Sequence, residues 1–448
     1  MRPSSPDGDG ISDSLPLLRV HLLEDDLRSL HAEVEKAGRA VGIKLETFLD
    51  ASSFWETPLR ARALPQAARE VCREVQAECV TQPGRAATDR ELQLCGTTAA
   101  RYLRQLRRAA QRARKSKEGW VWLDSDMSSA FTNSTEAAAR RAVGAVLSGA
   151  EWATLAAPND GVRRAVVLAR PPGHHNGCDE RLEELDRNAW RHAAHGGCIF
   201  NETAVAIRHL RARASSPLRF AVVDLDVHFG DGTAWHFYED PDVLCVSVHL
   251  DQSDSHVFPY LKGKAEERGS GKGLGTTLNL PLAEGAGDAE ATRLLQEYAW
   301  PAAREHRPDM LFVSLGFDGL QGDPAGAGIQ YTAAFFEHAV EACCALCPRT
   351  VCTLQGGYQP DDMAEAVAAV LRVLAGRPPS RDLSGTPSKE FQEAVAGLGR
   401  KLHDPTLWWS VGRSFDYVPV SADGEDMEES PRLEESSDDV AADDALQK

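Results

Sequence analysis

The sequence predicts an α/β protein, a single large domain built on a mainly parallel, multi-stranded sheet with helices on both faces. Short apolar runs rich in β-branched residues recur in the later part of the 448-residue chain and alternate with helical stretches. Strands that are apolar on both faces and alternate with helices are typical of a parallel sheet covered on both sides. The five runs lie at residues 165–168, 220–223, 243–248, 310–315 and 350–354.

Helices are predicted before and between these strands. Over residues 17 to about 117, apolar residues recur at three- and four-residue steps among many alanines, leucines, arginines and glutamates, so this region is predicted to be mostly helical. Four further helices are expected at residues 201–213, 289–305, 332–346 and 361–374. The strands and helices together give the repeating order of an α/β domain.

The domain is expected to span residues 17–400, with its clearest pattern over 120–374. Residues 1–16 are predicted to be a flexible lead and residues 401–420 a C-terminal extension. The tail, residues 421–448, carries eleven acidic and two basic residues and few apolar ones, which is typical of disorder. Its net charge of −9 is half of the chain's −18. The mildly acidic remainder is not expected to bind nucleic acid directly.

The sequence indicates neither export nor membrane insertion. The first ten residues lack the apolar core of a secretory signal, and no apolar run approaches the roughly 20 residues that span a bilayer. We therefore expect a location in the nucleus or cytoplasm, with the ten cysteines reduced. Cys343, Cys344 and Cys347 lie in an alanine-rich helical stretch and are predicted to be core thiols. The basic run at 101–117 is predicted to be a solvated helix face.

Polar residues that can perform chemistry follow each predicted strand. In parallel α/β sheets, ligands bind beyond the carboxyl ends of the strands. The densest group consists of Asp224, Asp226, His228 and Asp231, directly after the run at 220–223. The other segments of this kind lie at residues 171–175, 247–249, 316–318 and 355–358. Their shared position predicts one site at the carboxyl edge of the sheet.

A metal ion suits this group. Asp226 and His228 are two residues apart, so in an extended backbone their side chains leave the same face. Asp318, after the run at 310–315, supplies a third ligand. Catalytic zinc takes three protein ligands and leaves a position open for water. An Asp-His-Asp set is harder and more anionic than three histidines, so Fe²⁺ could also occupy it.

The remaining polar residues suit proton transfer. His174 and His175 are adjacent and could act as base and acid. Asp224 and Asp231 remain once the metal ligands are assigned, and they could orient the two histidines. Tyr358 follows two glycines and could donate to an oxyanion. These parts describe metal-assisted hydrolysis of an amide-like carbonyl.

As a set, these motifs resemble the zinc-dependent histone deacetylase family. The form Arg-Pro-Pro-Gly-His-His at 170–175 looks like the class II branch of that family, and the resemblance is clear from about residue 120 to 374. The other matching segments lie at residues 197–201, 224–232, 316–318, 322–324 and 356–358. The resemblance implies the arginase/deacetylase fold and zinc-dependent hydrolysis of N-acetyl-lysine on histones or other proteins, hence a chromatin regulator.

The resemblance also implies roles for individual residues. His174 would pair with Asp224 and His175 with Asp231, while Tyr358 would hold the tetrahedral intermediate. A structural potassium ion is implied near the zinc. Its expected ligands are the side chain of Asp224, Ser247, and backbone oxygens of Asp226, His228 and Val248.

Three positions are expected to contact substrate. Asp126 would grip it from an upstream loop, and Phe258 would line the tunnel. The family usually has an aromatic residue at the position of Gly197, so one wall is missing here unless Trp190, in a longer stretch over 176–195, replaces it. We therefore expect a reshaped acyl channel that accepts more than acetyl. A further departure is Gln359, where the family commonly has asparagine.

Two other functions remain open at this point. The same site could deacetylate small molecules such as acetylpolyamines, because substrate choice lies in the rim loops. A pseudoenzyme that binds acyl-lysine or scaffolds a complex is a third possibility, and the complete set of catalytic residues argues against it. The sequence leaves the oligomeric state open.

Overall fold

The computed structural model describes most of one compact unit, Met1–Val411. The described residues are 17–22, 60–80, 85–96, 98–117, 119–123, 128–154, 162–177, 194–251, 258–259, 262–381, 383, 387, 389 and 391–393. A second unit, Gly412–Lys448, lies outside them. The predicted lead, C-terminal extension and acidic tail also lie outside the described residues, so those three predictions stand as they were made.

An eight-stranded sheet forms the centre of the unit, and every strand pair in it is parallel. Its order is β2-β1-β5-β10-β9-β6-β7-β8. The strands are β1 (Leu17–Leu22), β2 (Glu78–Val80), β5 (Arg163–Leu168), β6 (Phe220–Asp224), β7 (Val243–Leu250), β8 (Thr277–Leu282), β9 (Met310–Leu315) and β10 (Thr350–Leu354). A separate antiparallel pair joins β3 (Trp120–Trp122) to β4 (Ala130–Thr132). The predicted parallel sheet is therefore confirmed.

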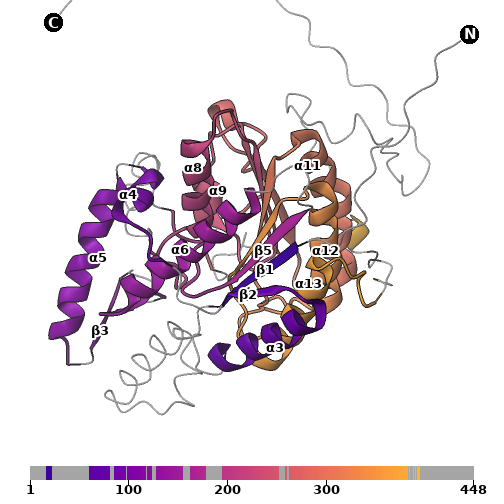
Figure 1. Ribbon diagram of the computed structural model, residues 1–448. Helices are drawn as coiled ribbons and strands as arrows, with labels where there is room; N and C mark the ends of the chain where they lie inside the picture. The colour runs from indigo at the N-terminus through magenta and orange to yellow at the C-terminus, as the bar shows by residue number, and fades with distance from the viewer. Residues whose placement is uncertain are drawn as a thin grey trace, which may run out of the picture. The chain divides into compact units, whose positions relative to one another are not determined.

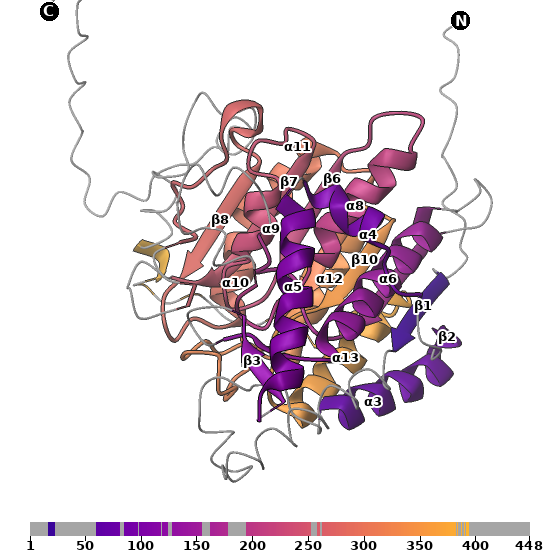
Figure 2. The ribbon, with the colours of Figure 1, turned by 90° about the vertical axis from the view of Figure 1, so that its left-hand side faces the viewer.

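Helices cover both faces of this sheet (Figure 1). On one face lie α4 (Asp89–Leu92), α5 (Thr98–Lys115), α6 (Thr135–Thr154) and α8 (Glu202–Arg213). On the other lie α3 (Arg60–Val75), α10 (Asp288–Leu294), α11 (Trp300–His306), α12 (Ala333–Leu346) and α13 (Pro360–Leu374). Figure 2 shows the first layer face on, with α5 nearest the viewer.

The alternation of side chains along each strand explains the two layers. In β5, Ala165 and Val167 pack in the core shared with α6 and α8, whereas Val166 and Leu168 pack in the core shared with α3 and α13. Full burial of a valine or leucine side chain contributes about 1.5–3 kcal/mol to stability. Because both faces of the sheet are covered, the central strands are mostly apolar on both sides, and this is why the sequence shows short continuous apolar runs.

All five predicted strands are present, as β5, β6, β7, β9 and β10, but three strands of the sheet were not predicted. The region 17–117 was predicted to be mostly helical, yet β1 and β2 lie in it. β1 pairs with β5 along its whole length, from Leu17 opposite Arg163 to Leu22 opposite Leu168. Six residues give too short a pattern to separate strand from helix. The edge strand β8 carries Pro281, which sheets tolerate at an edge and which weakens the strand signal.

The predicted helix at 289–305 is present in three segments. A π-helical turn, η4 (Leu295–Ala299), separates α10 from α11. Pro301 lies at the start of α11 and has no N–H to donate to the preceding turn. The π turn ends at Ala299, two residues before the proline, in the stretch where the missing N–H interrupts regular helical hydrogen bonding.

The cysteine and basic-helix predictions are also resolved. Cys343, Cys344 and Cys347 are free, buried thiols of the core, as predicted. In α5, Leu103 and Leu106 are buried, while the arginines of its outer face are mostly exposed. Among the described residues, no helix has the length and apolarity needed to cross a bilayer.

The buried His306 predicts a pH-dependent contribution to stability. Its Nε2 bonds to the carbonyl of Phe220 at 2.9 Å, and burial lowers its pKa from 6.5 to about 4. The neutral ring is favoured in the folded state, so this stability is present above pH 6.5 and is lost as pH falls toward 4, by about 1.4 kcal/mol per pH unit. Between pH 7 and pH 5, His306→Gln should lose about 2 kcal/mol less unfolding free energy than the parent, as measured by urea denaturation. His338→Gln, a partly exposed histidine, is the control, and equal losses in all three proteins would contradict the prediction.

Candidate active site

Four neighbouring strands bring the candidate site together. In the sheet, β5, β10, β9 and β6 are consecutive, so their carboxyl ends meet at one edge. The loop after β5 carries His174 and His175, and the group from Asp224 to Asp231 runs from the last residue of β6 to the first residue of the following helix, α9 (Asp231–His236). The loops after β9 and β10 carry Asp318 and Tyr358. The sheet order therefore joins segments that are distant in the chain.

The three predicted metal ligands converge. One potential ligand atom from each of Asp226, His228 and Asp318 lies within 4.8 Å of the other two. Nδ1 of His228 is 3.2 Å from Oδ1 of Asp226 and 3.0 Å from Oδ2 of Asp318. Two ligands of a tetrahedral zinc ion, each about 2.0 Å from it, lie roughly 3.3 Å apart. The arrangement and the anionic donor set therefore fit a divalent cation.

Two glycines make room for this cluster. A Cβ at Gly316 would lie 2.1 Å from Oδ2 of Asp226, and a Cβ at Gly356 would lie 2.2 Å from Oδ2 of Asp318. The glycine backbone also takes part, because the N–H of Gly356 donates to Oδ2 of Asp226 at 2.8 Å. The N–H of Val227 donates to Oδ1 of Asp318 at 3.0 Å. The carboxylates are thus oriented by main-chain groups of two loops.

The electrostatics of the cluster favour a cation. Burial and the nearby charge of Asp226 raise the pKa of Asp318 to about 6. Burial alone would lower the pKa of His228, but its bonds to the two carboxylates outweigh burial and raise that pKa to about 10. Carboxylates buried at this separation repel each other, so the site has an excess of negative charge that a metal ion would offset.

Each of the two adjacent histidines lies at hydrogen-bond distance from the carboxylate expected to orient it. Nδ1 of His174 is 3.0 Å from Oδ2 of Asp224, and Nδ1 of His175 is 2.9 Å from Oδ1 of Asp231. All four side chains are buried. Nε2 of His174 faces the three predicted metal ligands and lies 3.7 Å from Oδ2 of Asp226. The carboxylates thus engage the Nδ1 atom of each ring, and the Nε2 atom lies on the opposite side of the ring.

The two histidines differ in their electrostatic environment. Burial opposes a charge on His174, but Asp226 and Asp224 outweigh it and raise the pKa of His174 to about 9. Burial and the neighbouring His174 lower the pKa of His175 to about 3. The rings lie 3.9 Å apart between centroids, so one charge on the pair disfavours a second.

The turn that carries the histidines is tied to the end of β10. The side-chain oxygen of Gln355 accepts bonds from the N–H groups of Gly173, at 3.0 Å, and His174, at 3.2 Å. The side-chain amide nitrogen of Gln355 donates to Glu202 at 2.6 Å, and the Arg170 side chain donates to the main-chain carbonyl oxygen of Gln355. Gln355 thereby fixes the histidines relative to the loop that carries Tyr358.

Tyr358 is held by its backbone. Its N–H donates to Oδ2 of Asp323 at 2.6 Å, and the N–H of Gln359 donates to the same oxygen at 3.2 Å. Gly357 has φ +108°, a conformation that favours glycine. The predicted Gly-Gly-Tyr turn is therefore anchored by Asp323, a residue to which the sequence analysis gave no role.

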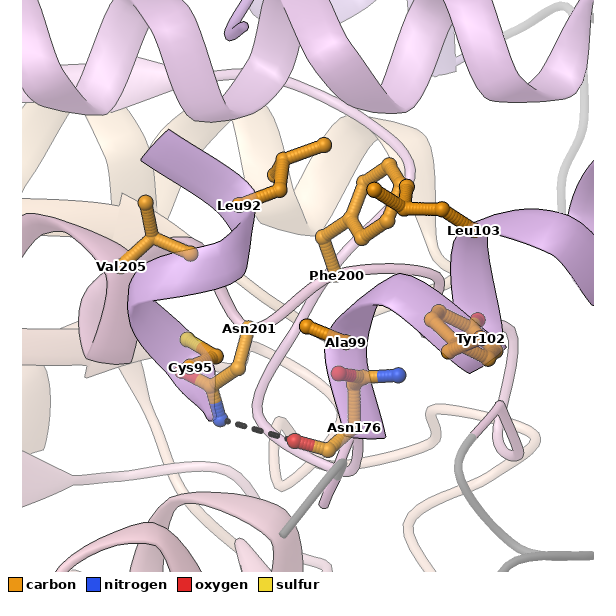
Figure 3. Close-up of a pocket in the computed structure, with 9 residues that line it drawn as sticks. All are labelled: Leu92, Cys95, Ala99, Tyr102, Leu103, Asn176, Phe200, Asn201 and Val205. Carbon is orange, nitrogen blue, oxygen red and sulfur yellow. Dashed lines mark hydrogen bonds between the residues drawn. The ribbon is translucent and has the colours of Figure 1, made fainter. Parts of the chain in front are cut away.

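Asn176, which follows His175, lies beside α5. The hydroxyl of Tyr102 donates to the carbonyl of Ile199 at 2.8 Å, and the amide of Asn201 donates to the carbonyl of Asn176 at 3.4 Å. A cavity of about 10 Å³ lies between these groups (Figure 3). It has space for about one water molecule, so it is too small for a substrate. These bonds instead hold the loop beneath the histidines.

Two of the residues expected to hold potassium are neighbours in the sheet. Asp224 and Ser247 are register partners on β6 and β7, and both are buried. The Ser247 hydroxyl also bonds to Nδ1 of His249 at 2.8 Å. The backbone-oxygen ligands assigned to Asp226, His228 and Val248 remain predictions.

The expected substrate contacts have different outcomes. The ring of Phe258 lies 4.8 Å from that of His175 and 6.0 Å from that of His228, so it borders the site. A Cβ at Gly197 would meet no atom within 4 Å, so that side is open in the described part of the structure. Asp126 and Trp190 lie outside the described residues.

Two residues near Asp231 had no predicted role. Nζ of Lys262 is 2.6 Å and Nε2 of His195 is 3.2 Å from Oδ2 of Asp231. The only sequence signals were proximity to Phe258 for Lys262 and to the unusual Gly196-Gly197 pair for His195. Neither signal specifies a contact with Asp231.

A substitution at Gly356 tests the candidate metal site without changing any of the three predicted ligand residues. In Gly356→Ala, the new methyl group would overlap the Asp318 carboxylate, so Zn²⁺ affinity should fall about 10- to 100-fold, the range typical of changed supporting groups. Calorimetric titration of the metal-free protein with Zn²⁺ measures this. Gly149→Ala in α6, away from the ligands, is the matched control and should bind like the parent. Equal affinity of all three proteins would show that the ligands are not packed as described.

Comparisons with known proteins agree with this geometry. A model of the histone deacetylase domain matches residues 55–374. Histone deacetylase HDA1 of Saccharomyces cerevisiae is 31% identical over 287 residues, which are 63% of this chain and 38% of that protein. Polyamine deacetylase HDAC10 of Homo sapiens is 34% identical over 275 residues, 60% of this chain and 38% of that protein. The chain therefore spans well under half the length of either curated relative.

A solved structure extends the likeness to the fold. The crystal structure of the HDA15 HD domain aligns with a TM-score of 0.69 and 27% identity. The alignment covers 88% of this chain and 96% of that one.

Proposed function

Because this chain belongs to the histone deacetylase family, we propose that it hydrolyses the amide of N-acetyl-lysine on histones or other proteins, with zinc held by Asp226, His228 and Asp318. The observation that supports this most is the convergence of these ligands with two buried His–Asp pairs at one edge of the sheet. Fe²⁺ is the alternative ion for this ligand set. A nuclear or cytoplasmic location remains the expectation from the sequence.

The reaction needs a polarised carbonyl, an attacking water and a protonated leaving amine. When bound, zinc supplies a Lewis acid that polarises the carbonyl and lowers the pKa of water. Of the pair His174 and His175, one Nε2 accepts the proton of the attacking water, and the amine leaves after receiving a proton. Asp224 and Asp231 keep both rings in the orientation that presents Nε2. Net hydrolysis yields the free amine and the carboxylic acid.

Other residues hold the substrate and the developing charge. The hydroxyl of Tyr358 donates a hydrogen bond to the oxyanion formed when the carbonyl is attacked. Phe258 packs along the acyl-lysine side chain, and Asp126 is proposed to bind the substrate backbone. A potassium ion at Asp224 and Ser247 would offset the buried negative charge behind His174.

A small acetylated amine, such as an acetylpolyamine, is the second candidate substrate. The named activity of the human relative supports it, because that protein is a polyamine deacetylase at 34% identity. The catalytic groups are the same for both substrates, so the rim of the site decides between them. A catalytically weak acyl-lysine-binding scaffold is the third candidate, and the complete set of site residues disfavours it.

Tyr358→Phe tests the catalytic proposal. Loss of the oxyanion donor should lower kcat about 10²- to 10³-fold while zinc content stays at the parental level. The assay uses zinc-loaded protein with acetyl-lysine peptides in one arm and acetylpolyamines in the other, and zinc is quantified by mass spectrometry. A variant as active as the parent would remove Tyr358 from the mechanism. A parent that binds acetyl-lysine peptide without hydrolysing either substrate would favour the scaffold.

The open side at Gly197 predicts a broad acyl range. Because a Cβ there would meet no atom of the described residues within 4 Å, acyl groups longer than acetyl should find space beside Phe258. Peptides carrying acetyl-, trifluoroacetyl- and longer acyl-lysine should therefore all be turned over, as compared by kcat/KM. A strict preference for acetyl would mean that another residue fills this side.

A further inference from the structure

Asp231 has a second set of partners besides His175. Its Oδ1 bonds to His175 at 2.9 Å, while its Oδ2 is 2.6 Å from Nζ of Lys262 and 3.2 Å from Nε2 of His195. Asp231 and His195 are almost fully buried, and the Lys262 side chain is 32% exposed. A buried carboxylate with both oxygens engaged has no freedom to rotate about its last bond.

The other pair is built differently. Asp224 bonds to His174 through Oδ2 and accepts the N–H of Asp226 at 3.1 Å through Oδ1. Within the described residues, no lysine or arginine lies in ion-pair distance of Asp224, whereas Lys262 contacts Asp231 directly. The two His–Asp pairs therefore differ in charge, because the Lys262 ammonium neutralises the carboxylate of Asp231 and no such side chain neutralises that of Asp224 within the described residues.

The spacing around Asp231 could be mistaken for a second metal site. Ligand atoms of His175, His195 and Asp231 all lie within 4.8 Å of one another. The Lys262 ammonium, however, already lies at hydrogen-bond distance from the carboxylate. A metal ion on Asp231 would face this charge at close range, and it would compete for a histidine needed for proton transfer. The cluster is thus better suited to an internal cation than to a bound one.

Both new partners come from firmly held backbone. Gly263, next to Lys262, donates its N–H to Glu267 at 3.0 Å, and its carbonyl accepts a bond from His249 at 2.9 Å. On the other side, the N–H of Gly196, which follows His195, donates to the hydroxyl of Ser128 at 2.8 Å. Groups anchored in this way can hold a neighbour in a fixed orientation.

We propose that Lys262 and His195 are positioning residues, which act through Asp231 to hold the His175 ring in its working orientation. The inference rests on the proposed deacetylase function for its kinetic consequence, but the orientation of His175 does not depend on the substrate. Lys262 fixes the Asp231 carboxylate and balances its charge, so that the bond from His175 to Oδ1 keeps its direction. His195 contacts the same Oδ2 atom of Asp231 through its Nε2 and so further restricts rotation of the carboxylate.

The test compares three lysine variants. Lys262→Met removes the ammonium but keeps much of the chain's bulk, Lys262→Arg keeps the charge, and Lys264→Met changes an exposed lysine two residues away. Steady-state kinetics with the best acyl-lysine peptide should show kcat reduced about 10- to 100-fold in Lys262→Met, with little change in KM. Lys262→Arg should recover much of kcat, and Lys264→Met should match the parent. His195→Leu should lower kcat less than Lys262→Met does, since its bond to Asp231 is longer.

A second measurement is independent of turnover. The Nδ1 proton that His175 shares with Asp231 should give a downfield proton NMR resonance, assigned by its absence in His175→Ala. The resonance should shift or broaden in Lys262→Met and persist in Lys264→Met. An unchanged resonance in Lys262→Met, or a parental kcat in that variant, would overturn the positioning role. An inactive parent would refute the proposed function, and the resonance would still decide the role of Lys262.

Discussion

The burial of several carboxylates at one edge of the sheet is the constraint on which the rest of the site depends. Asp224, Asp226, Asp231 and Asp318 are each at most 3% exposed. Two unit charges 4 Å apart interact by about 4 kcal/mol at an effective dielectric constant of about 20, so such a group cannot remain uncompensated. Histidine rings, backbone N–H groups and one lysine offset part of the charge. A divalent cation is the natural complement of what remains.

The fold compensates the buried negative charge mainly through the arrangement of its loops at one edge of the sheet. Because β5, β10, β9 and β6 are neighbours and parallel, four loops open at the same edge, and backbone N–H groups of the loops after β6 and β10 bind the carboxylates of Asp318 and Asp226. Gln355 and Asp323 then tie these loops to one another. Apolar packing on both faces keeps the strand ends in register, so the position of each ligand follows from the core beneath it.

The sequence predicted the centre of the molecule better than its periphery. Strands buried on both faces left long apolar runs, and residues such as Asp226 and His228 lie immediately after one of them, so position and chemistry could be predicted together. β1 was missed because six residues show no distinctive period, and its partner β5 lies more than 140 positions further on. Lys262 and His195 were missed because their role depends on meeting Asp231 in space, which no local pattern encodes. Asp126 and Trp190 lie outside the described residues.

The absence of side chains at Gly316 and Gly356 has a consequence for how related sequences are judged. A comparison limited to the aspartates, histidines and the tyrosine would overlook both glycines. The Asp226 and Asp318 carboxylates occupy space that a side chain at Gly316 or Gly356 would otherwise fill. A related sequence could therefore retain every predicted ligand and yet bind the metal more weakly because of one added methyl group. Judging whether a related sequence can hold the metal therefore requires checking the residues at the positions of Gly316 and Gly356 as well as the ligands.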